Sequence, residues 1–216
     1  MIDQGIIQKT EQFIAAKFGS EGSGHDWFHV DRVRKMALRI GRSEGGDLTV
    51  IELAALLHDL DDWKLSETET SGFSGATKWL NEQGVGSSVL EAIIRVIEDV
   101  SFKGAGTDTP VSSVESAVVQ DADRLDAIGA LGIARTFAYG GHKNRLIYDP
   151  EIAPVMHQSF QDYKNSQAPT INHFYEKLLL LKERMNTETA RKIAEERHQF
   201  MVNYLDRFFE EWDARR

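Results

Sequence analysis

Cysteine is absent from this chain of 216 residues, and its absence removes disulfide scaffolds, thiolate zinc sites and thiol nucleophiles together. A metal site in this protein must therefore be built from histidine, aspartate or glutamate side chains. Proline is scarce as well, with four residues, and runs that alternate β-branched with polar residues are few. The helix is consequently the first pattern to test along the chain.

Long apolar runs and excess basic charge are also missing. No run approaches the ~18 residues of a membrane-spanning helix, and the N-terminus lacks the basic-then-apolar profile of a signal peptide. The 25 Lys and Arg stand against 34 Asp and Glu, a formal net charge of −9. Nucleic-acid and anionic-membrane surfaces need a basic face. We therefore expect a cytoplasmic protein that binds neither, while a local basic pocket for a small anion is still allowed.

Helical periodicity fits almost the whole chain. Thr49 with Glu52, and Ser112 with Glu115, have the spacing of a capping box, which marks helix starts. The sequence predicts an all-α fold with eight or nine helices in a single domain that spans residues 1–216. The predicted helices cover about 4–18, Asp26 to the residue before Gly45, Thr49 to His58, 74–83, 88–100, 114–139, 170–185 and 188–213.

Charged residues within otherwise apolar helices are the informative anomaly, because a buried charge is costly without a partner or a metal. Two imidazoles and two carboxylates from three packed helices can form a mixed nitrogen and oxygen site for a divalent ion. Each residue also has an ordinary explanation, such as a solvated helix histidine or an aspartate paired with arginine. The candidates are His25 and His29, the adjacent pair His58 and Asp59, and Asp121 and Asp123.

The order and context of these residues resemble a known family. His29 in "HVDRV", His58-Asp59 in "LLHDLDD" and "DADRLD" at 121–126 resemble the H…HD…D signature of the HD superfamily of metal-dependent phosphohydrolases. Further similarity, in "GHDWFHVDRV", "DADRLDAIGALGIARTFAYGG" and "HFYEKLLLLKERMNTETARKIAEERHQFM", covers nearly the whole chain. It resembles the bacterial single-domain HD hydrolases, which include nucleoside triphosphate pyrophosphohydrolases. The resemblance implies a single HD-domain helical bundle over residues 1–216.

The resemblance also implies one divalent ion, which would be Mn, Mg, Co, Ni, Fe or Zn. Its implied ligands are His29, His58, Asp59 and Asp123, and Asp121 is the rival to the last of these. The activity implied is hydrolysis of a phosphate ester or anhydride by a metal-activated water. Related enzymes place an acidic residue where Asp62 stands, which makes Asp62 the candidate general base and Asp61 the next rival.

A phosphorylated substrate needs positive charge besides the metal. Lys64 directly follows the metal motif in "HDLDDWK" and is the first candidate for a catalytic phosphate contact. The predicted substrate is a small phosphorylated molecule, with a nucleotide or nucleoside triphosphate favoured. A non-catalytic metal-stabilised regulatory module, and a phosphatase of a non-nucleotide ester, are the alternatives. The candidate substrate-binding residues are His25, Arg135, His142 and Arg145.

Two further features bear on the substrate and on the oligomeric state. The run Leu60-Asp61-Asp62-Trp63 lacks the HDxxED form of the guanosine tetraphosphate hydrolases, so that activity is disfavoured. The last predicted helix has an apolar face that can pack internally or form a homodimer, and the sequence leaves both open. This face carries Phe200, Tyr204, Phe208 and Trp212.

Overall fold

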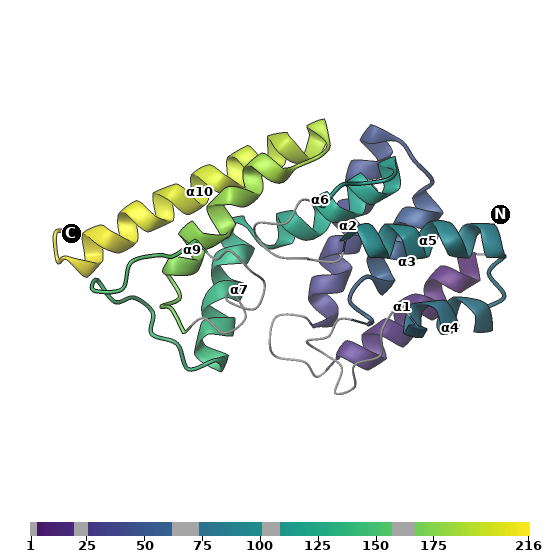
Figure 1. Ribbon diagram of the computed structural model, residues 1–216, viewed down its shortest axis with the longest axis horizontal. Helices are drawn as coiled ribbons and strands as arrows, with labels where there is room; N and C mark the ends of the chain where they lie inside the picture. Colours follow the sequence, from purple (N-terminus) through teal and green to yellow (C-terminus); the bar gives the residue numbers. More distant parts are fainter. Residues whose placement is uncertain (1–3, 20–25, 62–73, 101–108, 157–166) are drawn as a thin grey trace. The chain divides into compact units, whose positions relative to one another are not determined.

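The computed structural model describes residues 4–19, 26–61, 74–100, 109–156 and 167–216, and every regular element in these ranges is a helix (Figure 1). Nine α-helices and one 3₁₀ helix are present in the described part of the chain. The prediction of an all-α fold is confirmed. None of the described helices is both long enough and apolar enough to cross a membrane.

The chain divides into two compact units, and each is described by itself. The first comprises residues 1–103 and 108–123, and the second comprises residues 104–107 and 124–216. The predicted single-domain organisation over residues 1–216 stays a prediction.

The first unit is organised around a short buried helix. Helix α3 (Leu48–Leu57) contacts α1 (Gln4–Phe18), α2 (Trp27–Glu44) and α5 (Ser87–Val100). Seven of its ten residues are buried, as expected for a helix that is apolar on most sides. The residues that directly follow α3 therefore emerge from the interior of this unit.

Aspartate side chains cap the N-termini of α2 and α3, the two helices that position His29, His58 and Asp59. At the start of α2, Oδ1 of Asp26 accepts a hydrogen bond from the backbone N–H of His29 at 2.9 Å. At the start of α3, Oδ1 of Asp47 accepts from the N–H groups of Thr49, at 2.8 Å, and Val50. The predicted cap at Thr49 is wrong, because Asp47 stands two residues earlier and satisfies the first free N–H groups of the helix.

The predicted helix over 114–139 is also wrong, because the chain breaks it in two. Helix α6 (Val114–Asp126) ends three residues before α7 (Gly129–His142) begins. Ile128 is extended, and Gly129 has a φ of 76°, a left-handed conformation that glycine adopts without steric cost. Asp123 and Arg135 consequently lie on different helices.

The second unit packs aromatic side chains from several short elements against its long last helix. It contains α7, α9 (Asn172–Glu176), the 3₁₀ helix η1 (Leu178–Arg184) and α10 (Glu188–Trp212), so the predicted helix over 170–185 divides into two elements. The Tyr204 ring of α10 stacks on Phe174, and Tyr148 meets Phe208 edge to face. Internal packing thus covers part of the apolar face of α10, and the homodimer stays a prediction.

Candidate metal centre

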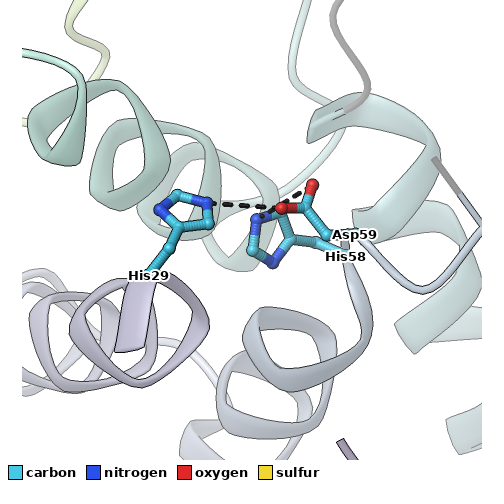
Figure 2. Close-up of side chains that lie close together, drawn as sticks. All are labelled: His29, His58 and Asp59. Atoms are coloured by element: carbon cyan, nitrogen blue, oxygen red, sulfur yellow. Dashed lines mark ion pairs between the residues drawn. The ribbon is translucent and has the colours of Figure 1, made fainter. Parts of the chain in front are cut away.

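Three candidate ligands converge within the first unit. His29 lies in the first turn of α2, and His58 and Asp59 directly follow the last residue of α3. All three residues are buried, and one ligand atom from each lies within 4.8 Å of the other two. Figure 2 shows the two imidazole rings and the Asp59 carboxylate turned toward one another. They are three of the six residues that the sequence singled out as titratable groups in apolar helices.

The orientation of His58 favours a role as a metal ligand. Its Nδ1 lies 2.8 Å from the carbonyl oxygen of Ala55, and since a carbonyl can only accept, Nδ1 carries the proton. In the neutral ring Nε2 then holds a lone pair. Nε2 is buried and has no hydrogen-bond partner among the described residues. This is the arrangement that fixes a ligating histidine in metal sites, where the second ring nitrogen is held by a carbonyl or carboxylate.

His29, on α2, approaches the same cluster of side chains as His58 and Asp59. It is 2% exposed, and its Nε2 lies 3.3 Å from Oδ2 of Asp59. The centroids of the His29 and His58 rings are 5.5 Å apart, with an interplanar angle of 63°. The Asp26 cap holds the first turn of α2 and with it the backbone of His29. The position of His29 is therefore set by a helix start and by burial together.

Helix α6 brings a second carboxylate to the two imidazoles. Oδ1 of Asp123 lies 3.6 Å from Nε2 of His29 and 3.9 Å from Nε2 of His58. The Asp123 side chain is 37% exposed, whereas Asp121, its rival in the sequence, is fully buried. The Asp123 carboxylate thus lies close to both imidazoles and is partly open to solvent, whereas Asp121 is shut off from solvent.

The donor set matches the requirements of a divalent ion. Two atoms that each lie about 2.1 Å from one ion are themselves about 3 to 3.5 Å apart. His29 Nε2 and Asp59 Oδ2 are separated by 3.3 Å, and His58 Nε2 and Asp59 Oδ1 by 3.5 Å. Two neutral imidazoles and two carboxylates carry a total charge of −2, and such nitrogen and oxygen donors suit borderline divalent metals. The residues present therefore fit a divalent ion.

Asp61 occupies a different position from the ligands. Its two carboxylate oxygens accept hydrogen bonds from the backbone N–H groups of Gly75 and Ala76, each at 3.0 Å. Both donors belong to the start of helix α4 (Ser74–Glu82). The alternative general base is thus engaged with the backbone of another helix.

Three of the remaining candidates belong to the second unit, and three lie outside the described residues. Arg135 is on α7 in the second unit, and its Nη1 is 2.8 Å from Oδ2 of Asp126. His142 is the exposed last residue of α7, and the Arg145 guanidinium lies 5.8 Å from the centroid of the Tyr139 ring. Their substrate-binding roles stay predictions. His25, Asp62 and Lys64 lie outside the described residues.

Two sets of hydrogen bonds near the site were not predicted from the sequence. The carbonyl of Ala55 orients His58 from three positions earlier, a spacing that helical geometry makes available and that could have been found. The bonds from Asp61 to Gly75 and Ala76 join residues 14 and 15 positions apart. Nothing in the local pattern marks that pairing.

Comparison with known proteins places the chain in a family. The HD domain profile matches residues 27–128, a range that includes His29, His58, Asp59 and Asp123. YpgQ from Bacillus subtilis, described as uncharacterized, is 44% identical over an alignment of 204 positions that covers 92% of this chain and 91% of that protein.

Solved structures agree over nearly the full length. A protein from Lactobacillus plantarum superposes with a TM-score of 0.86 and 38% identity over 99% of this chain and 100% of its own. An HD-superfamily hydrolase from Bacillus thuringiensis gives 0.77 and 44% identity over 98% of both chains. YpgQ crystallised with ADP gives 0.75 and 38% identity over 95% of this chain and 96% of its own. The chain therefore belongs to the HD-domain family and is close to the bacterial HD-superfamily hydrolases.

Proposed function

We propose that this protein is a divalent-metal-dependent phosphohydrolase that acts on nucleotides or nucleoside triphosphates. The observation that carries the proposal is the buried cluster of His29, His58 and Asp59, in which Nε2 of His58 is held without a hydrogen-bond partner among the described residues. A metal-ligating histidine has its other ring nitrogen held by a carbonyl or carboxylate in this way.

The proposed ligands are His29, His58, Asp59 and Asp123. Asp123 is preferred to Asp121 because its Oδ1 lies near both imidazoles and its side chain is partly open to solvent. When bound, a divalent ion at this point lowers the pKa of a water molecule and polarises a phosphoryl oxygen. The four side chains hold the charge in place, and the burial of His29, His58 and Asp59 excludes competing water from that side.

Acid–base and phosphate roles are proposed for residues around the centre. Asp62, four positions after His58, is the proposed general base, which takes the proton of the attacking water. Lys64 is proposed to contact a phosphoryl oxygen and offset its negative charge. His25, Arg135, His142 and Arg145 are the proposed substrate-binding residues.

The substrate class is supported by one relative. YpgQ, which is 44% identical to this chain, has been crystallised with ADP. A nucleoside diphosphate offers phosphoryl oxygens to a metal centre and a base to the surrounding protein. We therefore propose a nucleotide in preference to a non-nucleotide phosphate ester.

The test is release of phosphate and pyrophosphate from nucleoside mono-, di- and triphosphates by chelator-stripped protein, with Mn, Mg, Co, Ni, Fe or Zn added singly. We expect metal-dependent release from some of these nucleotides, and the released product distinguishes a phosphatase from a pyrophosphohydrolase. His58→Ala should lose stoichiometric metal binding and turnover together.

Two results would contradict the proposal. Stoichiometric metal binding without release from any nucleotide would favour a regulatory module or a phosphatase of another ester. Full activity in metal-free His58→Ala protein would remove the metal centre from the reaction.

A further inference from the structure

A carboxylate clasp joins the turn after α3 to the start of α4. Oδ1 of Asp61 accepts from the N–H of Gly75, and Oδ2 accepts from the N–H of Ala76, both at 3.0 Å. These are the second and third residues of α4, where N–H groups lack partners within the helix. The helix N-terminus also carries a partial positive charge that favours a carboxylate. Asp61 thus acts as a cap for a helix that begins 13 residues later in the chain.

The clasp leaves no room for a side chain at Gly75. A Cβ atom built on Gly75 would lie 2.5 Å from Oδ1 of Asp61 and 3.2 Å from its Cγ. Real Cβ atoms essentially never show a contact of 2.5 Å, so the carboxylate or the helix would have to move. The close approach therefore depends on glycine at this position.

Helix α4 is itself fixed to the core of the first unit. The Trp79 ring stacks on Phe13 of α1, with 4.1 Å between centroids and an interplanar angle of 8°. Its Nε1–H donates to Oγ1 of Thr10 at 2.9 Å. Ala76 and Leu80 are fully buried. The clasp consequently connects the turn that bears His58 and Asp59 to a packed helix.

We infer that Asp61 is a positioning residue for the metal centre, and that the Asp61–Gly75 clasp sets the place of Asp59 two residues earlier in the same turn. Asp59 approaches both imidazoles at 3.3 and 3.5 Å, so a shift of the turn alters its distance to both. The inference rests on the proposed metal centre. It assigns Asp61 to holding the site and leaves the proton transfer to another group.

The inference is tested by the affinity of chelator-stripped protein for Mn²⁺, measured by isothermal titration calorimetry. Changes to groups that orient metal ligands commonly cost about 10- to 100-fold in affinity, and we expect a loss in this range for Asp61→Ala. Gly75→Ala should give a similar loss. Because Gly75→Ala keeps the charge of Asp61 and favours the helix in its intrinsic propensity, its loss reports on geometry and not on removal of a negative charge.

Two further variants complete the design. Asp61→Asn keeps one acceptor oxygen and should lose less affinity than Asp61→Ala, and it carries the test together with Gly75→Ala if Asp61→Ala does not fold. Thr187→Ala is the matched control, because the Thr187 hydroxyl caps α10 in the second unit by accepting from the N–H of Ala190. It should lower the melting temperature without changing Mn²⁺ affinity.

The overturning results are distinct from failure of the proposed function. Unchanged Mn²⁺ affinity in folded Asp61→Ala and Gly75→Ala proteins overturns the positioning role. A large loss of kcat in Asp61→Ala with unchanged Mn²⁺ affinity does the same, because it makes Asp61 a catalytic group. Wild-type protein that binds Mn²⁺ but hydrolyses no nucleotide contradicts the proposed function alone, since the affinity measurements stand without turnover.

Discussion

At the scale of single residues, three of the side chains that the sequence marks as possible metal ligands are also ones that the structure buries. His29, His58 and Asp59 are charged or titratable residues in apolar segments, and all three are buried. Because burying such groups is costly without a partner, their presence in an apolar helix indicates a specific role. The sequence could not choose between Asp121 and Asp123, because that choice depends on how α6 is rotated against the two imidazoles.

The different roles proposed for the adjacent residues Asp61 and Asp62 can be tested by single substitutions. Asp61 holds α4, and Asp62 is the proposed general base. Asp62→Asn should therefore keep Mn²⁺ affinity and lower kcat by about 100-fold or more, the usual contribution of a general base. The measurement pairs calorimetric metal titration with steady-state kinetics on the best nucleotide substrate.

Asp61→Ala, examined alongside, should show the opposite pattern, with metal affinity as the first property affected. Wild-type kcat in Asp62→Asn would reject Asp62 as the base and return that role to an unassigned group.

At the scale of elements, the sequence predicted where helices exist better than where they start and stop. The predicted start of the second helix at Asp26 is confirmed, since Asp26 caps α2. An aspartate directly before an amphipathic run has few competing explanations. The α3 cap and the break between α6 and α7 were missed. Asp47 competes with Thr49 for the same N–H groups, and Gly129 stands inside an apolar run that has no other sign of a break.

A long-range bond ties α6 to the start of α3, and this bond should be sensitive to pH. Oε1 of Glu115, in the first turn of α6, accepts from the N–H of Asp47 at 2.9 Å. That hydrogen bond is the main cause that lowers the pKa of Glu115 below its ordinary value of 4.5. A carboxylate with a depressed pKa in the folded state stabilises the fold above its ordinary pKa, and the contribution is lost as the pH falls through the folded value.

Glu115→Gln mimics the protonated acid, so it should lower the free energy of unfolding at pH 7 by about 1 kcal/mol. The difference from wild type should vanish at an acidic pH below the depressed folded pKa of Glu115, where the wild-type carboxyl is protonated as well. Urea unfolding at the two pH values measures both quantities. Glu188→Gln is the matched control, because Glu188 also lies in the first turn of a helix but pairs with Lys192 on the surface. A Glu115→Gln effect of equal size at both pH values would contradict the argument.

At the scale of the whole molecule, the sequence predicted the all-α class and the family, since both follow from patterns spread over most of the chain. The division into two compact units was not predicted. No proline-rich or polar linker marks the division, which falls inside α6 between Asp123 and Arg124. A boundary inside a helix has no compositional signal, because the helix continues through it.

The placement of all four proposed ligands in the first unit predicts where metal binding stabilises the molecule. A ligand that binds only the folded state adds about 2.7 kcal/mol at 100 times its Kd, and that energy acts on the elements that carry the ligand atoms. Hydrogen exchange of stripped protein, with and without Mn²⁺, should therefore gain protection chiefly in α2, in α3 and in α6 around Asp123, with smaller changes in α9 and α10.

His58→Ala provides the control, because a protein that lacks this ligand should show no gain at the same Mn²⁺ concentration. Equal protection across α3 and α10 would mean that the ion stabilises both units to the same extent. Protection confined to α10 would place the bound ion outside the cluster of His29, His58 and Asp59, because only groups that contact the ion, or pack on those that do, are stabilised directly.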